Sequence, residues 1–134
     1  MPDDQAIREA RLRGEAFVSK IFAEPAMLDL ETFAARAGMT AEDVQDRWRR
    51  RELLMLESAN SGVRFPEWQL GQDGQPLPAI GALFSVLTHA WAVYRFLTQH
   101  HPELSGQTGL EAIMSGRSNE AVITAQGIVD GNFS

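Results

Sequence analysis

Apolar residues recur at helical spacing along most of the 134-residue chain. From residue 4 to about residue 23 they form one amphipathic stripe, and Glu24–Pro25 ends this helix because a residue before proline avoids the helical region. A second helix is expected from about Asp29, leading into a pair of short helices over residues 33–51. Four further short helices are predicted from the spacing of Ile80, Leu83, Phe84 and Leu87, of Trp91, Tyr94 and Leu97, of Leu110, Ile113 and Met114, and of Ala121, Val122, Ala125, Ile128 and Val129.

The two short helices of residues 33–51 have the layout of a helix-turn-helix, whose second helix can lie in the major groove of DNA. Gly38 stands where the first helix must end, since glycine adopts the left-handed conformation at little cost. Thr40 then offers a side-chain oxygen to cap the second helix, with Asp43 as its capping-box partner. Two ordinary packed helices would give the same pattern, so DNA binding is one of two interpretations of it.

The spacing around Gly38 fits this motif with one departure. Ala34, four residues before the glycine, is small enough to let the helices approach, and Val44, six residues after it, is apolar as the motif requires. The position nine residues after the glycine is usually apolar but is Arg47, so we expect the neighbouring Trp48 to pack there instead. The residues expected to meet between the two helices are Phe33, Ala34, Ala37, Met39, Val44 and Trp48.

The period of the pattern changes after the second helix of the motif. Residues 53–56 are a short apolar run, residues 58–62 have turn chemistry, and residues 63–65 alternate as a strand does. We expect a small β-hairpin, or wing, directly behind the motif, with Pro66 restricting the second strand to a sheet edge. Trp68 is expected to pack this hairpin onto the helices.

The predicted fold is therefore mainly α and has two parts. Residues 1–70 hold the N-terminal helix, the helix-turn-helix and the hairpin wing. Residues 71–78 contain two glycines and two prolines, which predicts a linker. Residues 79–134 are expected to form a compact helical bundle with little room for a deep pocket.

The net charge of −6 argues against a broad nucleic-acid-binding surface. Four arginines nevertheless cluster at the end of the motif, where cations also simply suit the helix dipole. The candidate DNA contacts are Thr40, Gln45, Arg47, Arg49, Arg50, Arg51 and, on the wing, Arg64, which is otherwise a solvated strand charge. Glu42, Asp43 and Asp46 in the same helix repel phosphates, so binding should be weak unless a dimer doubles the contacts.

The chain offers little to an enzyme or to a metal site. It has no cysteine, which excludes disulfides and thiolate ligands, and it has no glycine-rich phosphate loop. His89, His100 and His101 meet no metal-binding or triad spacing and are expected to be solvated loop residues. We therefore predict a protein that is not an enzyme and that has no catalytic, cofactor-binding or metal-binding residue. No apolar run approaches the length of a membrane span and the N-terminus lacks the regions of a signal peptide, so the protein is expected in the cytoplasm.

Three blocks of the second half resemble the C-terminal toxin-binding domain of the Xre/MbcA/ParS antitoxin family, namely residues 90–97, 102–117 and 120–122. The family pattern runs through a tryptophan-bearing helix, a Leu-x-Gly-x-Thr-Pro-Leu segment and a helix closed by glycine. Gly109 stands where the family usually has proline. Residues 53–57 and 64–69 are similar to family members that carry an N-terminal helix-turn-helix, so the resemblance covers about residues 27–134.

This resemblance implies a type II antitoxin, which neutralises a cognate toxin, often of the RES class that consumes NAD, and commonly represses its own operon. The family's C-terminal tail approaches the entrance of the toxin's active site. Gly131, Asn132, Phe133 and Ser134 match the usual ending of that tail loosely, so they are the candidate toxin contacts. The alternative is that Phe133 folds back onto its own bundle.

Two other functions stay open beside the antitoxin. The protein is then either a stand-alone DNA-binding transcription regulator, whose C-terminal bundle only dimerises, or a protein-binding module with a vestigial helix-turn-helix. We expect a homodimer that pairs through the N-terminal helix, because this helix has more apolar surface than the motif needs. Pairing through the C-terminal bundle is the alternative.

Overall fold

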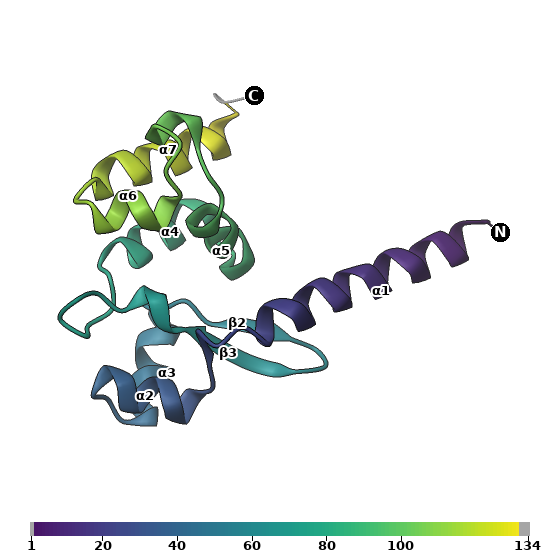
Figure 1. The fold of residues 1–134 in the computed structure, drawn as a ribbon, viewed down its shortest axis with the longest axis horizontal. Coiled ribbons are helices and arrows are strands. Elements are labelled where there is room, and N and C mark those ends of the chain that lie inside the picture. The colour runs from purple at the N-terminus through teal and green to yellow at the C-terminus, as the bar shows by residue number, and fades with distance from the viewer. Residues whose placement is uncertain (1, 132–134) are drawn as a thin grey trace.

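The computed structural model describes residues 2–131 of the chain. Within them the fold is mainly α, as predicted, with a small three-stranded sheet. In chain order the elements are α1 (Pro2–Phe22), β1 (Met27–Leu28), α2 (Leu30–Ala37), α3 (Ala41–Arg49), β2 (Leu56–Ser58), β3 (Gly62–Pro66), η1 (Glu67–Gln69), α4 (Ala79–Leu87), α5 (Ala90–Thr98), η2 (Pro102–Leu104), α6 (Gly109–Met114) and α7 (Ser118–Asp130). Figure 1 shows an N-terminal unit of α2, α3 and the sheet, a C-terminal unit of α4 to α7 above it, and α1 projecting away from both.

The hairpin expected behind the motif is confirmed, and a third strand joins it. β2 pairs with the first part of β3, with Leu56 opposite Arg64 and Ser58 opposite Gly62. β1 pairs with the last two residues of β3, so the strand order is β1-β3-β2. Pro66 therefore ends a central strand, and the expectation of an edge strand is wrong. The proline is tolerated because the pairing with β2 stops at Arg64, so Pro66 has only β1 beside it.

Two hydrophobic cores lie on either side of residues 53–56. Successive side chains alternate between them, since Leu53 and Met55 belong to the core of the N-terminal unit and Leu54 and Leu56 to the core of the C-terminal unit. The C-terminal core also includes the end of α1, together with buried residues of α4 to α7. Residues 71–78 form turns between η1 and α4. The C-terminal core contains residues from both sides of these turns.

A buried glutamine holds this dividing segment in place. Gln69 has no exposed surface, and its side-chain amide accepts a hydrogen bond from the Leu54 N–H (2.7 Å) and donates one to the Leu54 carbonyl (2.8 Å). The amide thus acts as a strand partner would, because it pairs both polar groups of a buried stretch of backbone. Glutamine is ordinarily a surface residue, so the sequence pattern gave no indication of this role.

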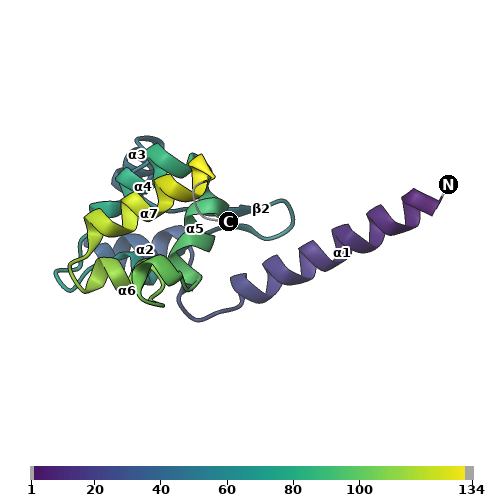
Figure 2. The ribbon, with the colours of Figure 1, turned by 90° about the horizontal axis from the view of Figure 1, so that it is seen from above.

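The first helix joins the body of the protein only near its end. Ile21 and Phe22 are buried in the C-terminal core, whereas Ile7, Leu12 and Phe17 each leave more than half of their surface exposed. Figure 2 shows α1 extending sideways from the two units. The predicted N-terminal helix is confirmed, and most of its apolar stripe lies uncovered within the described chain.

Helices α4 and α5 turn sharply against each other. The angle of the bend is 118°, and Thr88 between the two helices has a positive φ (67°), which residues other than glycine rarely adopt. Within residues 2–131 no single helix is long and apolar enough to cross a membrane, and only this bent pair reaches that length and hydropathy when taken together.

The start of α6 explains the departure at Gly109. Thr108 and Glu111 form a capping box there, and Gly109 is the first helical residue. A Cβ at this glycine would lie 2.6 Å from the Phe96 carbonyl oxygen, so a larger residue does not fit. The same carbonyl accepts a hydrogen bond from His101 Nε2 (2.8 Å), and the His101 ring stacks on that of Phe96. His101 is therefore buried, and the expectation of a solvated loop residue is wrong for it.

Replacing Gln69 by Leu should lower the free energy of unfolding by about 2–6 kcal/mol, because two buried backbone groups lose their partner at about 1–3 kcal/mol each. Urea unfolding followed by circular dichroism measures the effect. Gln99→Leu, at an exposed position after α5, is the matched control and should leave the midpoint nearly unchanged. Equal midpoints for the two variants would contradict the role of Gln69.

Replacing Gly109 by Ala should destabilise the protein by about 1–3 kcal/mol, because the added methyl group forces Phe96 to move. Gly81→Ala in α4 is the control, since a Cβ there comes no closer than 3.7 Å, an ordinary contact, to the Arg51 carbonyl oxygen. This control should stabilise its helix by about 0.5–1 kcal/mol. The melting temperatures of the two variants should therefore move in opposite directions, and a shift of the same sign would count against the steric argument.

Candidate nucleic-acid interface

The α2–α3 motif is closed by the caps that the sequence indicated. Asp29 Oδ1 accepts a hydrogen bond from the Thr32 N–H (2.8 Å) at the start of α2, and this bond holds the pKa of Asp29 below its ordinary value. Gly38 ends α2 in the left-handed conformation (φ 69°). Thr40 Oγ1 accepts from the Asp43 N–H (3.0 Å), and the capping box starts α3. Local hydrogen bonds thus fix the turn and the direction in which α3 leaves it.

Five of the six residues expected between the two helices do pack in the N-terminal core: Phe33, Ala34, Ala37, Met39 and Val44. Trp48 does not belong to this core and is 37% exposed, so the prediction of its packing role is wrong. Leu53 and Met55, which follow α3 in the chain, complete the core instead. The apolar position missing from α3 is therefore supplied by the next segment.

The wing is firmly attached to the motif. The ring of Phe33 on α2 stacks on that of Phe65 on β3, with centroids 5.1 Å apart. Arg36 of α2 also forms an ion pair with Glu67, which follows β3. The hairpin and the two helices therefore share one packed core, in which these aromatic rings are buried.

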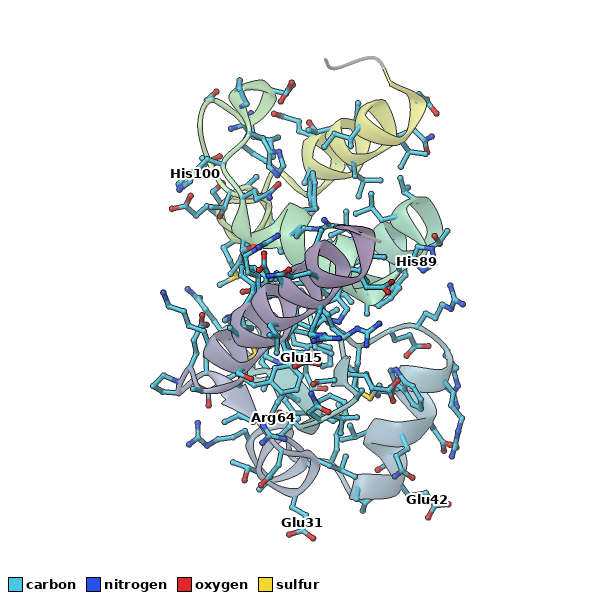
Figure 3. The ribbon with its side chains drawn as sticks, turned by 90° about the vertical axis from the view of Figure 1, so that its right-hand side faces the viewer. Glu15, Glu31, Glu42, Arg64, His89 and His100 are labelled. Atoms are coloured by element: carbon cyan, nitrogen blue, oxygen red, sulfur yellow. The ribbon has the colours of Figure 1, made fainter. Side chains whose placement is uncertain are left out.

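The face of α3 opposite Val44 is open to solvent. Val44 is fully buried, whereas Glu42, Gln45 and Arg49 are exposed. Figure 3 shows Glu42 directed away from the rest of the protein. Arg49 Nη1 lies 3.0 Å from Asp46 Oδ1, so part of its charge is neutralised within the helix. The face offers an amide, a guanidinium and carboxylates, all of which can hydrogen-bond to base edges.

The fold places the four clustered arginines in different surroundings. Arg47 is half-buried, and Arg50 is exposed just after α3. Arg51 reaches the C-terminal unit, where its Nη1 donates a hydrogen bond to the Thr88 carbonyl (3.2 Å). Arg49 and Arg50 are thus the members of the cluster that face solvent most freely.

Arg64 on the wing is engaged within its own chain. Its Nη1 donates to the Val63 carbonyl (2.7 Å) and to the Ser61 carbonyl (3.3 Å). Its guanidinium carbon also lies 5.5 Å from the ring centroid of Phe22, at the distance of a cation–π contact. A phosphate contact by Arg64 would therefore compete with these interactions.

Among the predicted toxin contacts, the structure describes only Gly131, which follows α7. Gly131 caps this helix in the left-handed conformation (φ 76°). Asn132, Phe133 and Ser134 lie outside the described residues. Within residues 2–131 no group of three or more histidine, aspartate or glutamate side chains is placed to hold a metal ion.

No protein-family model matches the chain, and no curated protein matches it. Among solved structures, the chain is similar to the NMR structure of Rv2175c, a Mycobacterium protein, with a TM-score of 0.68. The two proteins are 21% identical, and the match covers 79% of this chain and 84% of the other. At this level of identity the similarity shows the fold alone.

Proposed function

We propose that the protein is a DNA-binding transcription regulator that reads double-stranded DNA through the outer face of α3. The observation that carries this proposal is that Gln45 and Arg49 stand on an exposed helix face whose opposite side is locked into the core by Val44. Amide and guanidinium groups are suited to the adenine and guanine edges in the major groove. The attached hairpin adds a second surface for contacts to the DNA backbone.

The charge of the protein limits the strength of this binding. The chain carries a net charge of −6, and Glu42 and Asp46 lie on the same helix as the reading residues. Each carboxylate repels the DNA phosphates and therefore weakens binding. A single copy should therefore bind weakly, and two copies on a two-fold symmetric site would double the favourable contacts.

A contact between two copies of α1 is our proposal for the dimer. Ile7, Ala10, Gly14 and Phe17 follow each other at alternating spacings of three and four residues, as along the seam of paired helices. Ile7 and Phe17 are largely exposed in the single chain. In an antiparallel pair Ile7 would meet Phe17 of the second copy, and the small residues at the centre would let the helices approach.

Replacing Gln45 by Ala should weaken binding to the DNA of the protein's own operon by about 1–3 kcal/mol, the value of one lost bidentate contact to a base. Asp46→Asn should act in the opposite direction, because it removes a repulsive carboxylate and releases Arg49. Fluorescence anisotropy at low and moderate salt measures both effects. The affinity itself should fall steeply as the salt concentration rises.

Gln99→Ala, on the C-terminal unit, is the matched control and should bind DNA as the unchanged protein does. Light scattering of the same samples should give the mass of a dimer. If operon DNA produces no signal at either salt concentration while the dimer is present, DNA reading by α3 is rejected. A monomer mass would reject the α1 contact.

The antitoxin role predicted from the family resemblance is a second candidate function. It is favoured by the end of α7, where Ile128 and Val129 are 42% and 53% exposed beside Gly131. A hollow of about 240 Å³ next to Ile128, lined in part by Leu87 and Phe96, continues this apolar surface. Exposed apolar side chains gathered beside a hollow are typical of a surface that binds another protein.

Deleting residues 131–134 should weaken binding to a RES-like toxin encoded beside this protein. Loss of one buried phenyl ring is worth about 2 kcal/mol, which corresponds to roughly thirtyfold in affinity. Co-expression and pull-down test whether the complex forms, and calorimetry with the purified proteins measures its affinity. Ile123→Ala on α7 is the control. If the truncated protein binds as tightly as before, the tail is not the contact, and if it unfolds at a lower temperature, the tail covers its own bundle.

A further inference from the structure

A cleft separates the end of α3 from the turn between α4 and α5. Its volume is about 690 Å³, and both units contribute to its walls. In Figure 3, His89 at this turn and Glu42 on α3 lie on the same side of the molecule. Pockets for small molecules commonly lie between structural units and have roughly 300–1,000 Å³, so the cleft has room for an organic ligand.

Aromatic side chains form the apolar part of the cleft, namely Trp48, Phe84 and Trp91. Trp91 is held firmly, because its Nε1 donates a hydrogen bond to the Glu57 carbonyl (3.3 Å) and its ring stacks on that of Phe22. Trp48 comes from α3 and is 37% exposed, because it does not take part in the core formed by its expected packing partners. An indole on each side of the cleft favours a planar ring between them.

Cationic side chains form the polar part of the cleft. Arg49 and Arg51 both line it, against one carboxylate, Glu57. Asp46 on α3 pairs with Arg49, so the excess of positive charge is confined to the lining of the cleft itself, in a chain of net charge −6. His89, which begins α5 at the same edge, makes no side-chain cap, so the first turn of that helix also presents backbone N–H groups there. The polar groups of the cleft therefore suit an anion.

The backbone around the cleft is strained on both sides. Arg51 (φ 61°) and Thr88 (φ 67°) each have a positive φ, and the hydrogen bond from Arg51 Nη1 to the Thr88 carbonyl joins them. Strain of this kind persists only where the surroundings hold it, and it is concentrated at functional sites. This hydrogen bond links the two walls of the cleft.

We propose that this cleft binds a small planar aromatic carboxylate, which acts as an effector of DNA binding. The ring would lie between Trp48 and Trp91, and the carboxylate would pair with Arg49, since Arg51 already donates to the Thr88 carbonyl. The regulatory part of the proposal rests on the function proposed above, because Arg49 lies both in the cleft and on the face that reads DNA. A ligand that engages Arg49 removes it from the DNA, so ligand and DNA weaken each other's binding by the same factor.

The test uses 2-naphthoate as the probe, and calorimetry without DNA measures its binding to the full chain. The expected dissociation constant is on the order of 0.1–1 mM, as for a ligand held by one ring and one ion pair. Trp48→Ala and Arg49→Gln should each weaken binding at least about tenfold, the loss expected for one desolvated contact. Ile123→Ala, an exposed apolar residue on α7, is the control and should bind the probe normally. Circular dichroism confirms that each variant is folded.

The uncharged 2-naphthamide separates the contribution of the aromatic ring from that of the carboxylate. It should bind at least about tenfold more weakly than 2-naphthoate, since it lacks the carboxylate that pairs with arginine. Equal binding of the two compounds would overturn the anion specificity. If 2-naphthoate does not bind, or if neither variant changes its affinity, the cleft is not the binding site.

A second measurement repeats the DNA titration with saturating 2-naphthoate. The affinity for operon DNA should fall, and the fall should disappear in Trp48→Ala. Probe binding without any effect on DNA affinity would overturn the regulatory role while supporting the site. If DNA does not bind even without the probe, the proposed function fails, and the calorimetry still decides whether the cleft takes an aromatic carboxylate.

Discussion

The packing of the two halves of the molecule depends on the pair of hydrogen bonds between the Gln69 amide and the backbone of Leu54. Residues 53–56 send alternate side chains into opposite cores. A shift of this segment by one residue would exchange every apolar side chain between the two cores, so its register must be fixed. No strand lies beside Leu54 to fix it among the described residues, and the glutamine side chain takes that role.

The same segment determines how α3 is presented. It follows α3 directly, and its residues Leu53 and Met55 complete the core on which α3 rests. On the other side, the hydrogen bond from Arg51 to Thr88 attaches the end of α3 to the C-terminal unit. The exposed face of α3 and the aromatic cleft therefore meet at one helix end, where Trp48 and Arg49 are neighbours in the chain. This arrangement is the physical basis of the coupling that we propose between the cleft and DNA binding.

Much of the fold was determined by the sequence itself, because the signals are local. The turn at Gly38, the cap at Thr40, the hairpin and the four C-terminal helices were all predicted from residue type and spacing. Each depends on hydrogen bonds or periodicity within a few residues of the chain. The residues of α3 that face solvent follow in the same way, since burial of Val44 fixes the opposite face of a regular helix.

Other features were decided only by the tertiary structure. β1 exists because two residues meet Phe65 and Pro66, far along the chain, and Trp48 is exposed because Leu53 and Met55 complete the core without it. The four clustered arginines look alike in the sequence, yet the carbonyl of Thr88 draws Arg51 away from the others. Each of these outcomes depends on which distant surface packs against a residue. Residue type and local spacing do not encode that choice. Neither the cleft nor the different surroundings of the arginines could therefore be predicted from the sequence.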